Sequence, residues 1–292
     1  MSQEHSDAVA TLLGPAEVRE LAARLDVTPT KKLGQNFVHD PNTVRKIVRL
    51  AGVTEHDEVI EIGPGLGSLT LGLTEVGASV TAIEIDPRLA AQLPQTQAQM
   101  QPNAKLRVVL SDALDLDRSH LEGQPAPTVL VANLPYNVSV PILMHLLELI
   151  PELQSGLVMV QAEVGYRIAA GPGSKEYGSP SAKAAWYGDW SIAGTVSRKI
   201  FWPIPGVDSV LVGFAKHAEP IGTEAERATT FALVNAAFAG RRKMIRQSLQ
   251  AAIPGSTTES VSELVQRAGL DPQARAESLS ISDYLRITRV LV

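Results

Sequence analysis

Hydrophobic residues in the first two thirds of the chain occur in short runs rich in β-branched side chains. Each run ends abruptly in acidic or turn residues. The clearest runs are Glu58–Ile62, Ser79–Ile85, Leu106–Leu110 and Thr128–Ala132. Continuous apolar runs of this length, bounded by turn residues, predict strands that are buried on both faces.

Helical patterns separate these runs. They cover Leu66–Val76, Pro87–Met100 and Val140–Ile150, and the second opens on a proline, which suits the first turn of a helix. Strands that alternate with helices of this length indicate a parallel sheet with crossover connections. Further strands are expected at Leu157–Gln161 and Ser209–Phe214. The pattern therefore predicts a doubly wound, Rossmann-like α/β domain that ends near residue 217.

The hydrophobic pattern changes beyond Glu219, from strands alternating with helices to helices alone. Residues 224–252 read as one long helix with an apolar stripe close to a 3.6-residue period, and shorter helices are expected at Val261–Ala268 and Ile281–Leu291. Near the N-terminus, Ala16–Leu25 reads as a helical arm. We therefore expect two domains: residues 1–217, the arm with the α/β domain, and residues 218–292, a small all-α domain.

Composition narrows the chemistry. The chain of 292 residues has no cysteine, which excludes disulfides, thiolate metal sites and a cysteine nucleophile, and we expect no metal. No apolar run reaches the length of a membrane helix and the polar N-terminus lacks a signal-peptide pattern, so a soluble cytoplasmic protein is expected. The net charge of −5 argues mildly against a nucleic-acid partner, although basic residues cluster locally.

A glycine-rich loop follows the first predicted strand. It runs from Glu61 to Gly67 with the pattern GxGxG, and Glu84 and Asp112 follow the next two strands. Acids at those strand ends can accept hydrogen bonds from ribose hydroxyls and from an adenine amine. Pro64 removes one of the amides that a pyrophosphate would need. The loop therefore favours S-adenosylmethionine, a cation without phosphates, over a dinucleotide, while a turn without a ligand is the plainer alternative.

The tetrapeptide Asn133-Leu134-Pro135-Tyr136 follows the fourth predicted strand. The side-chain oxygen of Asn133 and the main-chain carbonyl of Leu134 can accept the two hydrogens of an adenine N6 amine, and Pro135 holds the turn fixed. Tyr136 can stack on a base that has left its helix. The alternative is an ordinary Asn-Pro turn after a buried strand. Its position downstream of the cofactor loop favours the methyl-acceptor interpretation.

The chain resembles the ribosomal RNA adenine dimethyltransferases of the kasugamycin-resistance type, which act on the small subunit. The matching segments, in chain order, are Lys32–Phe37, Glu61–Gly67, Ile83–Asp86, Ser111–Ala113, Asn133–Asn137, Gln161–Val164, Tyr177-Gly178, Phe201–Ser209 and Arg241–Lys243. They span nearly the whole chain. The resemblance implies a class I S-adenosylmethionine-dependent methyltransferase that dimethylates adjacent adenosines in the 3′-terminal hairpin of 16S rRNA, and we expect it to act as a monomer.

The resemblance also implies roles for individual residues. Those expected to contact the cofactor are Gln35, Asn36, Val38, Gly63, Gly65, Glu84, Asp112 and Asn133. Phe201 is expected to close on the flipped adenine from the face opposite Tyr136. The residues expected to dock RNA of the small subunit from the helical domain are Arg241, Arg242, Lys243 and Arg246.

The chain departs from the family pattern at several positions. Ala162 replaces a customary lysine, Trp202 adds a ring beside Phe201, and Tyr177–Ala184 lacks the usual continuation after Tyr-Gly. Two other functions remain open: an erythromycin-resistance methylase of 23S rRNA and a non-catalytic RNA-binding assembly factor with the same fold. A dinucleotide oxidoreductase fails on the glycine loop and leaves the Asn133 tetrapeptide unexplained.

Overall fold

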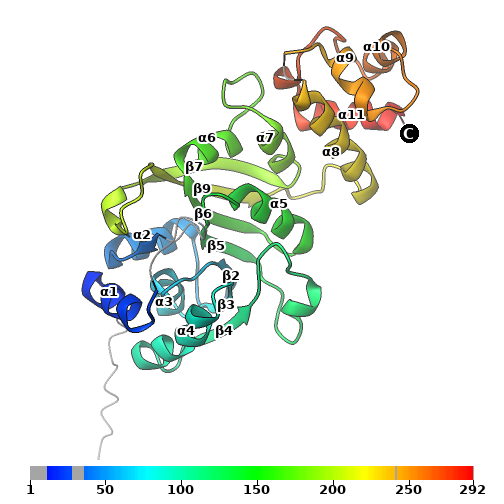
Figure 1. Cartoon of the computed structure of the whole chain (residues 1–292). Coiled ribbons are helices and arrows are strands. Elements are labelled where there is room, and N and C mark those ends of the chain that lie inside the picture. The colour runs from blue at the N-terminus through cyan, green and yellow to red at the C-terminus, as the bar shows by residue number, and fades with distance from the viewer. Residues whose placement is uncertain (1–11, 28–35, 241, 292) are drawn as a thin grey trace, which may run out of the picture. The chain divides into compact units, whose positions relative to one another are not determined.

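The computed structural model describes residues 12–27, 36–240 and 242–291 (Figure 1). The chain forms two compact units that alternate along the sequence. One contains the chain up to Ala162 together with Ala193–Gly213, and the other contains Glu163–Ile192 together with the chain from Phe214 onward. A single boundary after residue 217 stays a prediction.

A seven-stranded sheet forms the framework, with strand order β4-β3-β2-β5-β6-β9-β7. Its strands are β2 (Glu58–Ile62), β3 (Ser79–Glu84), β4 (Lys105–Leu110), β5 (Val129–Asn133), β6 (Ser155–Gln161), β7 (Gly188–Val196) and β9 (Ser209–Lys216). The five strands from β4 to β6 pair in parallel. The chain builds outward from β2 to β3 on one side and to β5 on the other, so the strand order reverses between β2 and β5. A ligand crevice is expected beyond the carboxyl ends of the strands at such a point.

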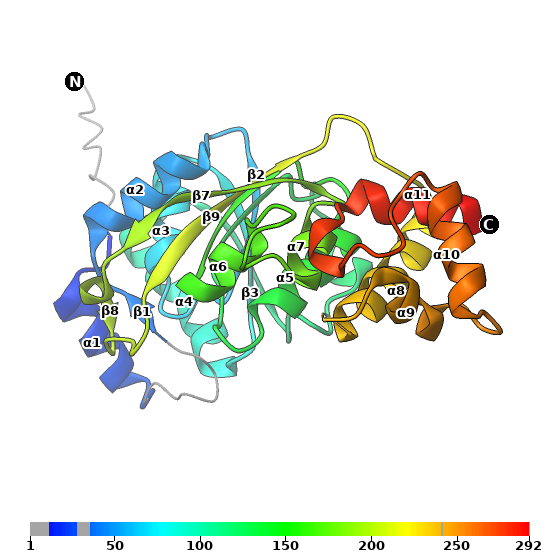
Figure 2. The ribbon, with the colours of Figure 1, turned by 90° about the horizontal axis from the view of Figure 1, so that it is seen from above.

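Helices cover both faces of the parallel strands (Figures 1 and 2). The helices of the first unit are α1 (Pro15–Arg24), α2 (Pro41–Ala51), α3 (Ser68–Glu75), α4 (Pro87–Met100), η1 (Arg118–Leu121), α5 (Ser139–Leu149) and η2 (Arg198–Ile200). Val59, Val131 and Leu157 share one core cluster with α2 and α3. Their neighbours Ile60 and Leu130 are equally buried and point to the opposite face, because side chains alternate along a strand.

A small second sheet lies next to the glycine loop. Its two antiparallel strands are β1 (Phe37–Val38) and β8 (Phe201–Trp202), and they pair Phe37 with Trp202 and Val38 with Phe201. Ser68 at the start of α3 donates to the carbonyl of Val38 at 2.5 Å. These contacts fix the segment before the α/β fold against the first turn of α3.

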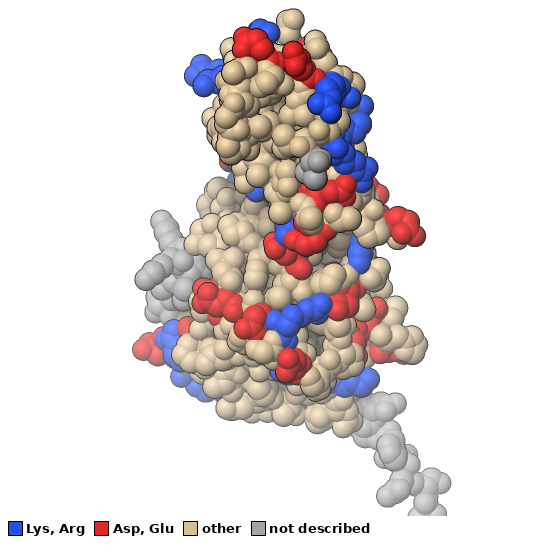
Figure 3. All heavy atoms as spheres, turned by 90° about the vertical axis from the view of Figure 1, so that its right-hand side faces the viewer, with Lys and Arg blue, Asp and Glu red and all other residues tan. Residues whose placement is uncertain are grey.

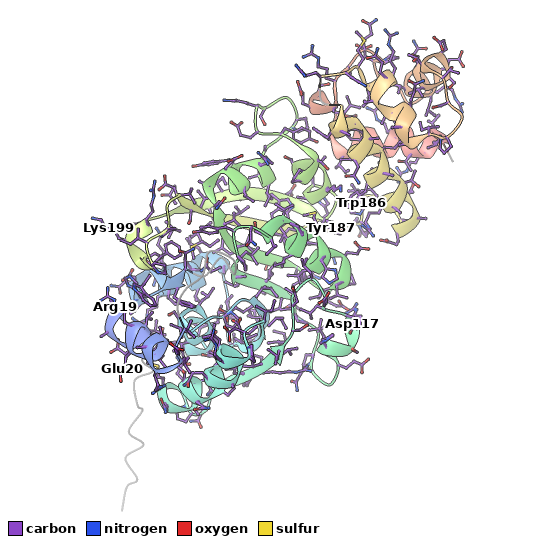
Figure 4. All side chains as sticks on the ribbon, viewed as in Figure 1. Arg19, Glu20, Asp117, Trp186, Tyr187 and Lys199 are labelled. Carbon is purple, nitrogen blue, oxygen red and sulfur yellow. The ribbon has the colours of Figure 1, made fainter. Side chains whose placement is uncertain are left out.

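The other unit has its own core. It contains α6 (Ala162–Ile168), whose first residue belongs to the first unit, and α7 (Ser179–Ala184), α8 (Glu224–Ala239), α9 (Ile245–Ser248), η3 (Leu249–Ala252), α10 (Thr258–Arg267), η4 (Ala276–Ser278) and α11 (Ile281–Leu291). The rings of Trp186 and Tyr187, labelled in Figure 4, both pack edge-on against Phe231 of α8. Tyr177 is buried in the same cluster, and its hydroxyl donates to the carbonyl of Leu279 at 2.9 Å. The Tyr177–Ala184 stretch therefore contributes to the core of the helical unit.

The single long helix expected over residues 224–252 is wrong. Helix α8 ends at Ala239, and Gly240 has non-helical dihedral angles, with φ −116° and ψ 46°. Met244 is extended and pairs with Arg275, which starts α9 in a new direction. Ile245 and Leu249 are buried as their pattern predicted, but they are placed by a short separate helix. The apolar spacing continues past Gly240 although the helix ends there, so periodicity alone could not reveal that two helices are present.

The α/β fold with a helical C-terminal region is confirmed. Strand β7 was not predicted, because its sequence mixes polar and small residues at the edge of the sheet, where most of them are exposed. In the described ranges no helix is long and apolar enough to cross a membrane, and no cluster of three His, Cys, Asp or Glu side chains there could hold a metal ion.

Candidate active site

Two adjoining hollows lie beyond the carboxyl ends of β2 to β5. Both are lined by Gly63, Ile85 and Pro135, so they form one cleft at the point where the strand order reverses. The first hollow brings together most of the predicted cofactor residues: Asn36, Val38, Gly63, Gly65, Glu84 and Asn133. The second contains Asp112. Gln35 lies outside the described residues.

The glycine loop uses its own amides. The N–H of Gly63 donates to Ile83 O at 2.9 Å and that of Gly67 to Pro64 O at 2.9 Å, while the N–H of Gly65 donates to Glu84 Oε2 at 3.0 Å. Pro64 has no N–H to offer. A pyrophosphate would have to compete for every one of these donors. The loop therefore fits a ligand without phosphates, which argues against the dinucleotide alternative.

Close packing requires glycine at position 65. Gly65 has a φ of +58°, and a Cβ there would lie 2.9 Å from the ring of Phe37. A side chain would have to displace the segment that carries Asn36 and Val38. The loop and this segment thus form one wall of the cleft.

Backbone hydrogen bonds fix the side chain of Glu84 at the end of β3. Its side chain is 4% exposed, and it accepts from the N–H of Gly65 through Oε2 and from the N–H of Asp86 through Oε1 at 2.9 Å. Burial raises the pKa of the Glu84 carboxyl, and hydrogen bonds from the backbone of Asp86, Gly65 and Ile85 oppose that rise. A carboxylate has about four acceptor positions, so it can still accept from a ribose hydroxyl, the partner expected at this strand end.

Glu61 is not simply a fixed negative charge at the start of the loop. Its side chain is 1% exposed and accepts a hydrogen bond from Thr70 Oγ1 at 2.6 Å. The pKa of the Glu61 carboxyl is raised to about 8, chiefly by burial; the hydrogen bond from Thr70 opposes the rise and the charge of Glu84 adds to it. A pKa in this range favours the protonated carboxyl at neutral pH.

Asp112 stands at the mouth of the second hollow. Its Oδ1 accepts from the N–H of Leu114 at 2.9 Å, which fixes the direction of the carboxylate. Ile85, Leu114 and Ile142 supply apolar walls beside it. Ile85 and Leu114 remain 48% and 39% exposed, so apolar surface is accessible beside the carboxylate. A flat base would cover them while Asp112 accepts from its amine.

Sequence reasoning missed these apolar residues. Ile85 follows β3, Leu114 lies in the turn after β4 and Ile142 is on α5; in the sequence none of them differs from an ordinary packing residue. Their place beside the cleft is set by the meeting of β3, β4 and α5, which the sequence does not show.

Asn133 connects the cofactor side of the cleft to the acceptor loop. Its Nδ2 donates to the main-chain carbonyl of Asn36 at 3.0 Å. Because a carbonyl can only accept, the amide nitrogen must face Asn36. The side-chain oxygen is thereby left for a donor that enters the cleft.

The rest of the tetrapeptide is fixed by the sheet. Leu134 is buried, with 1% of its side chain exposed, and its N–H donates to the carbonyl of Met159 on the neighbouring β6. Pro135 lines both hollows. Tyr136 is partly buried, and its hydroxyl shares a hydrogen bond with Ser209 Oγ at 2.6 Å. The loop is thus rigid where it would meet an acceptor.

The model of the ribosomal RNA adenine dimethylase family matches residues 28–292. This chain belongs to that family. A curated relative, ribosomal RNA small subunit methyltransferase A of Leifsonia xyli subsp. xyli, is 60% identical over 278 residues, which are 94% of this chain and 97% of the relative.

Solved structures agree with this family assignment. The 23S rRNA methyltransferase ErmE is similar with a TM-score of 0.65 and 27% identity, over 88% of this chain and 99% of that one. A dimethyladenosine transferase from Plasmodium falciparum shares the fold with a TM-score of 0.72 and 23% identity, over 86% and 95% of the two chains. The family member described here is an S-adenosylmethionine-dependent methyltransferase, and its cleft fits that cofactor.

The structure does not place Phe201 in the cleft. Its side chain is 1% exposed and lies in the core cluster with Val38 and Leu211. Phe201 belongs to strand β8, and the pairing of β8 with β1 directs its ring into the core. Stacking on a base would require this ring to leave the core. Trp202 stacks on Phe37, with 6.4 Å between ring centroids, and so braces the cofactor segment.

Of the residues expected to dock RNA, those that the structure describes lie in and just after the turn between α8 and α9. Arg242 and Lys243 are exposed between α8 and α9, while Arg246 on α9 is partly buried and donates to the sulfur of Met244. The pairing of Met244 with Arg275 brings a further exposed guanidinium to this turn. In the view of Figure 3, basic side chains follow one edge of the helical unit with acidic ones next to them. Arg241 lies outside the described residues.

Glu61 predicts a pH dependence of stability in the absence of cofactor. Its pKa is raised from 4.5 to about 8 in the folded chain, so between these values the unfolded chain loses its proton first. The free energy of unfolding should fall as pH rises from about 4.5 to 8, by roughly 3–5 kcal/mol from this group. The variant Glu61→Gln should remove that part of the fall in urea unfolding measured from pH 4.5 to 9. Parallel curves for the two proteins would contradict the assignment.

The burial of Phe201 predicts a cost in stability without any RNA. Phe201→Ala should lower the free energy of unfolding by about 3–5 kcal/mol, because it leaves a cavity in the core. Phe201→Leu should lose much less. Urea unfolding of the free protein measures both values, and an unchanged Phe201→Ala midpoint would show that the ring does not support the core.

Proposed function

We propose that this chain transfers methyl groups from S-adenosylmethionine to N6 of two adjacent adenosines in the 3′-terminal hairpin of 16S rRNA, and that each becomes N6,N6-dimethyladenosine. It acts as a monomer on the small ribosomal subunit in the cytoplasm. The 60% identical relative from Leifsonia xyli, a small subunit methyltransferase, supports the choice of subunit. Family membership supports adenine as the acceptor.

The orientation of the Asn133 amide carries this proposal. Its nitrogen is committed to the carbonyl of Asn36, so its oxygen accepts one N6–H of an adenine in the cleft. The carbonyl of Leu134 accepts the other. Two acceptors on one amine draw the nitrogen lone pair out of conjugation with the ring and toward the methyl donor. Asn36 also lines the cofactor hollow, so one hydrogen bond places both reactants.

S-adenosylmethionine, when bound, supplies an electrophilic methyl group on a sulfonium sulfur, which keeps the electron pair of the broken C–S bond and leaves as a neutral thioether. The chain's own residues provide orientation. The tetrapeptide holds the amine in line, and the N6 proton passes to solvent as the N–C bond forms. Positioning of this kind contributes several kcal/mol to a bimolecular reaction without a strong base.

We assign two aromatic residues to the flipped base, and they differ in how accessible their rings are in this structure. Tyr136 stands in the acceptor loop and is half-buried, so its ring can meet a base directly. Phe201 reaches the base only if β8 shifts when RNA binds. The Phe201 role is therefore proposed for the RNA-bound state.

The decisive experiment is to incubate the protein with methyl-labelled S-adenosylmethionine and unmethylated small subunits, then digest the RNA. Dimethyladenosine from the 3′-terminal hairpin is the expected product. Label on large subunits would indicate the activity named for the structural neighbour ErmE. Binding to small subunits without label would indicate an assembly factor.

Asn133→Ala should separate chemistry from binding. Loss of the amide removes an acceptor for N6–H and the tie to Asn36, so turnover should fall by about 100-fold or more. The cofactor dissociation constant, measured by calorimetry, should change by less than about tenfold, because Glu84 and Asp112 are untouched. Turnover close to that of the wild type would reject the acceptor role of Asn133.

Charge reversal should separate docking from the cleft. The double variant Arg242→Glu, Lys243→Glu should weaken binding to small subunits by about tenfold or more at low salt and leave cofactor affinity unchanged. A control with Arg24→Glu and Arg267→Glu alters two other exposed arginines and has the same net charge. Equal binding by the two variants would show that total charge, and not this turn, controls docking.

A further inference from the structure

The hydrogen bond between Tyr136 and Ser209 spans three neighbouring strands. Tyr136 follows β5, Ser209 is the first residue of β9, and β6 lies between them in the sheet (Figure 1). The two oxygens are 2.6 Å apart. A loop that follows one strand is thus tied to the start of a strand two positions away.

Ser209 is a fixed partner. Its side chain is 1% exposed, and the carbonyl of the preceding Asp208 accepts from the N–H of Ala162 at 2.8 Å, which joins the start of β9 to the end of β6. The Asp208 carboxylate accepts from Arg198 Nε at 2.5 Å, and Arg198 Nη1 donates to Gly206 O. Lys199, the next residue of η2 and labelled in Figure 4, is exposed. The position of the Ser209 hydroxyl is therefore set by the sheet and by the hydrogen bonds that Arg198 donates to Asp208 and Gly206.

The side chain of Tyr136 is less enclosed than that of Ser209. A tyrosine side chain turns about two torsions, and this one is only partly buried. Its hydroxyl is the point farthest from the backbone, so a hydrogen bond there restricts both torsions at once. The bond therefore sets the direction of a ring whose loop also carries Asn133 and Pro135, two residues that line the cleft.

We propose that Ser209 is a positioning residue that holds the Tyr136 ring in the orientation that stacks on the acceptor adenine, and that this matters most for the second methyl transfer to each adenine. This inference rests on the proposed function. Ser209 itself does not touch the base or the cofactor in this role.

The two transfers differ in what holds the amine. Adenine presents two N6–H groups to Asn133 Oδ1 and to the carbonyl of Leu134. After the first transfer only one N–H remains, so one of these two hydrogen bonds can no longer form. The monomethylated base must then be oriented to a larger extent by stacking. A loosened Tyr136 ring should therefore slow the second transfer more than the first.

The test uses Ser209→Ala, Tyr136→Phe and the double variant of the full chain on unmethylated small subunits. Single-turnover reactions at saturating S-adenosylmethionine resolve monomethyl- and dimethyladenosine after digestion. Each single variant should slow the second transfer by about 5- to 10-fold, the factor expected for one lost hydrogen bond, slow the first transfer less, and accumulate monomethyladenosine. The double variant should be no slower than either single variant, because both remove the same bond. Cofactor affinity should stay unchanged.

Thr288→Val is the matched control, since it removes a buried hydroxyl that pairs with Thr230 at 2.9 Å in the helical unit. It should leave the product ratio unaltered.

Equal slowing of both transfers, additive effects in the double variant, or loss of stability with an unchanged product ratio would each overturn the positioning role. If Ser209→Ala fails to fold, Tyr136→Phe breaks the same bond from the partly exposed side. A wild-type protein that yields no methylated adenine would instead reject the proposed function.

Discussion

The side-chain amide of Asn133 and the main-chain carbonyl of Asn36 meet at 3.0 Å, and the active site depends on this one contact. It joins the segment that lines the cofactor hollow to the loop that meets the acceptor. That segment is itself fixed by Ser68 and by pairing with β8. A disturbance on either side is therefore transmitted to the side-chain oxygen of Asn133, which we propose accepts from adenine. The contact explains how a reaction without a strong base can rely on geometry.

The chemical character of the cofactor site follows from where its polar groups are already committed. All three glycine amides of the loop donate within the protein, so a phosphate would have to compete for them. The site also holds two buried acids, Glu61 and Glu84, whose pKa values are raised by burial. An entering sulfonium would stabilise their ionised forms. The site thus favours a nucleoside that carries positive charge over one that carries a pyrophosphate.

The acceptor loop is rigid because neighbouring strands hold it from several directions. Leu134 is tied to β6 and Tyr136 to β9, while Pro135 fixes the turn between them. Phe201 is the exception, since the core holds it out of the cleft. Of the two aromatic residues that we propose for the base, Tyr136 is therefore oriented by a hydrogen bond, whereas Phe201 would need a change in β8 to reach it.

The sequence alone determined the elements and the order of the chemistry. Apolar runs ending in Gly63, Glu84 and Asp112 predicted a nucleotide-type cleft, and the tetrapeptide at Asn133 predicted the acceptor, because strand length and residue type are local properties. The break at Gly240 and the burial of Phe201 were decided by tertiary pairing, through the Met244–Arg275 bridge and the β1–β8 sheet. The Tyr136–Ser209 bond, between residues far apart in the chain, was decided in the same way. Such contacts depend on which strands become neighbours, and a hydrophobic pattern carries no record of that choice.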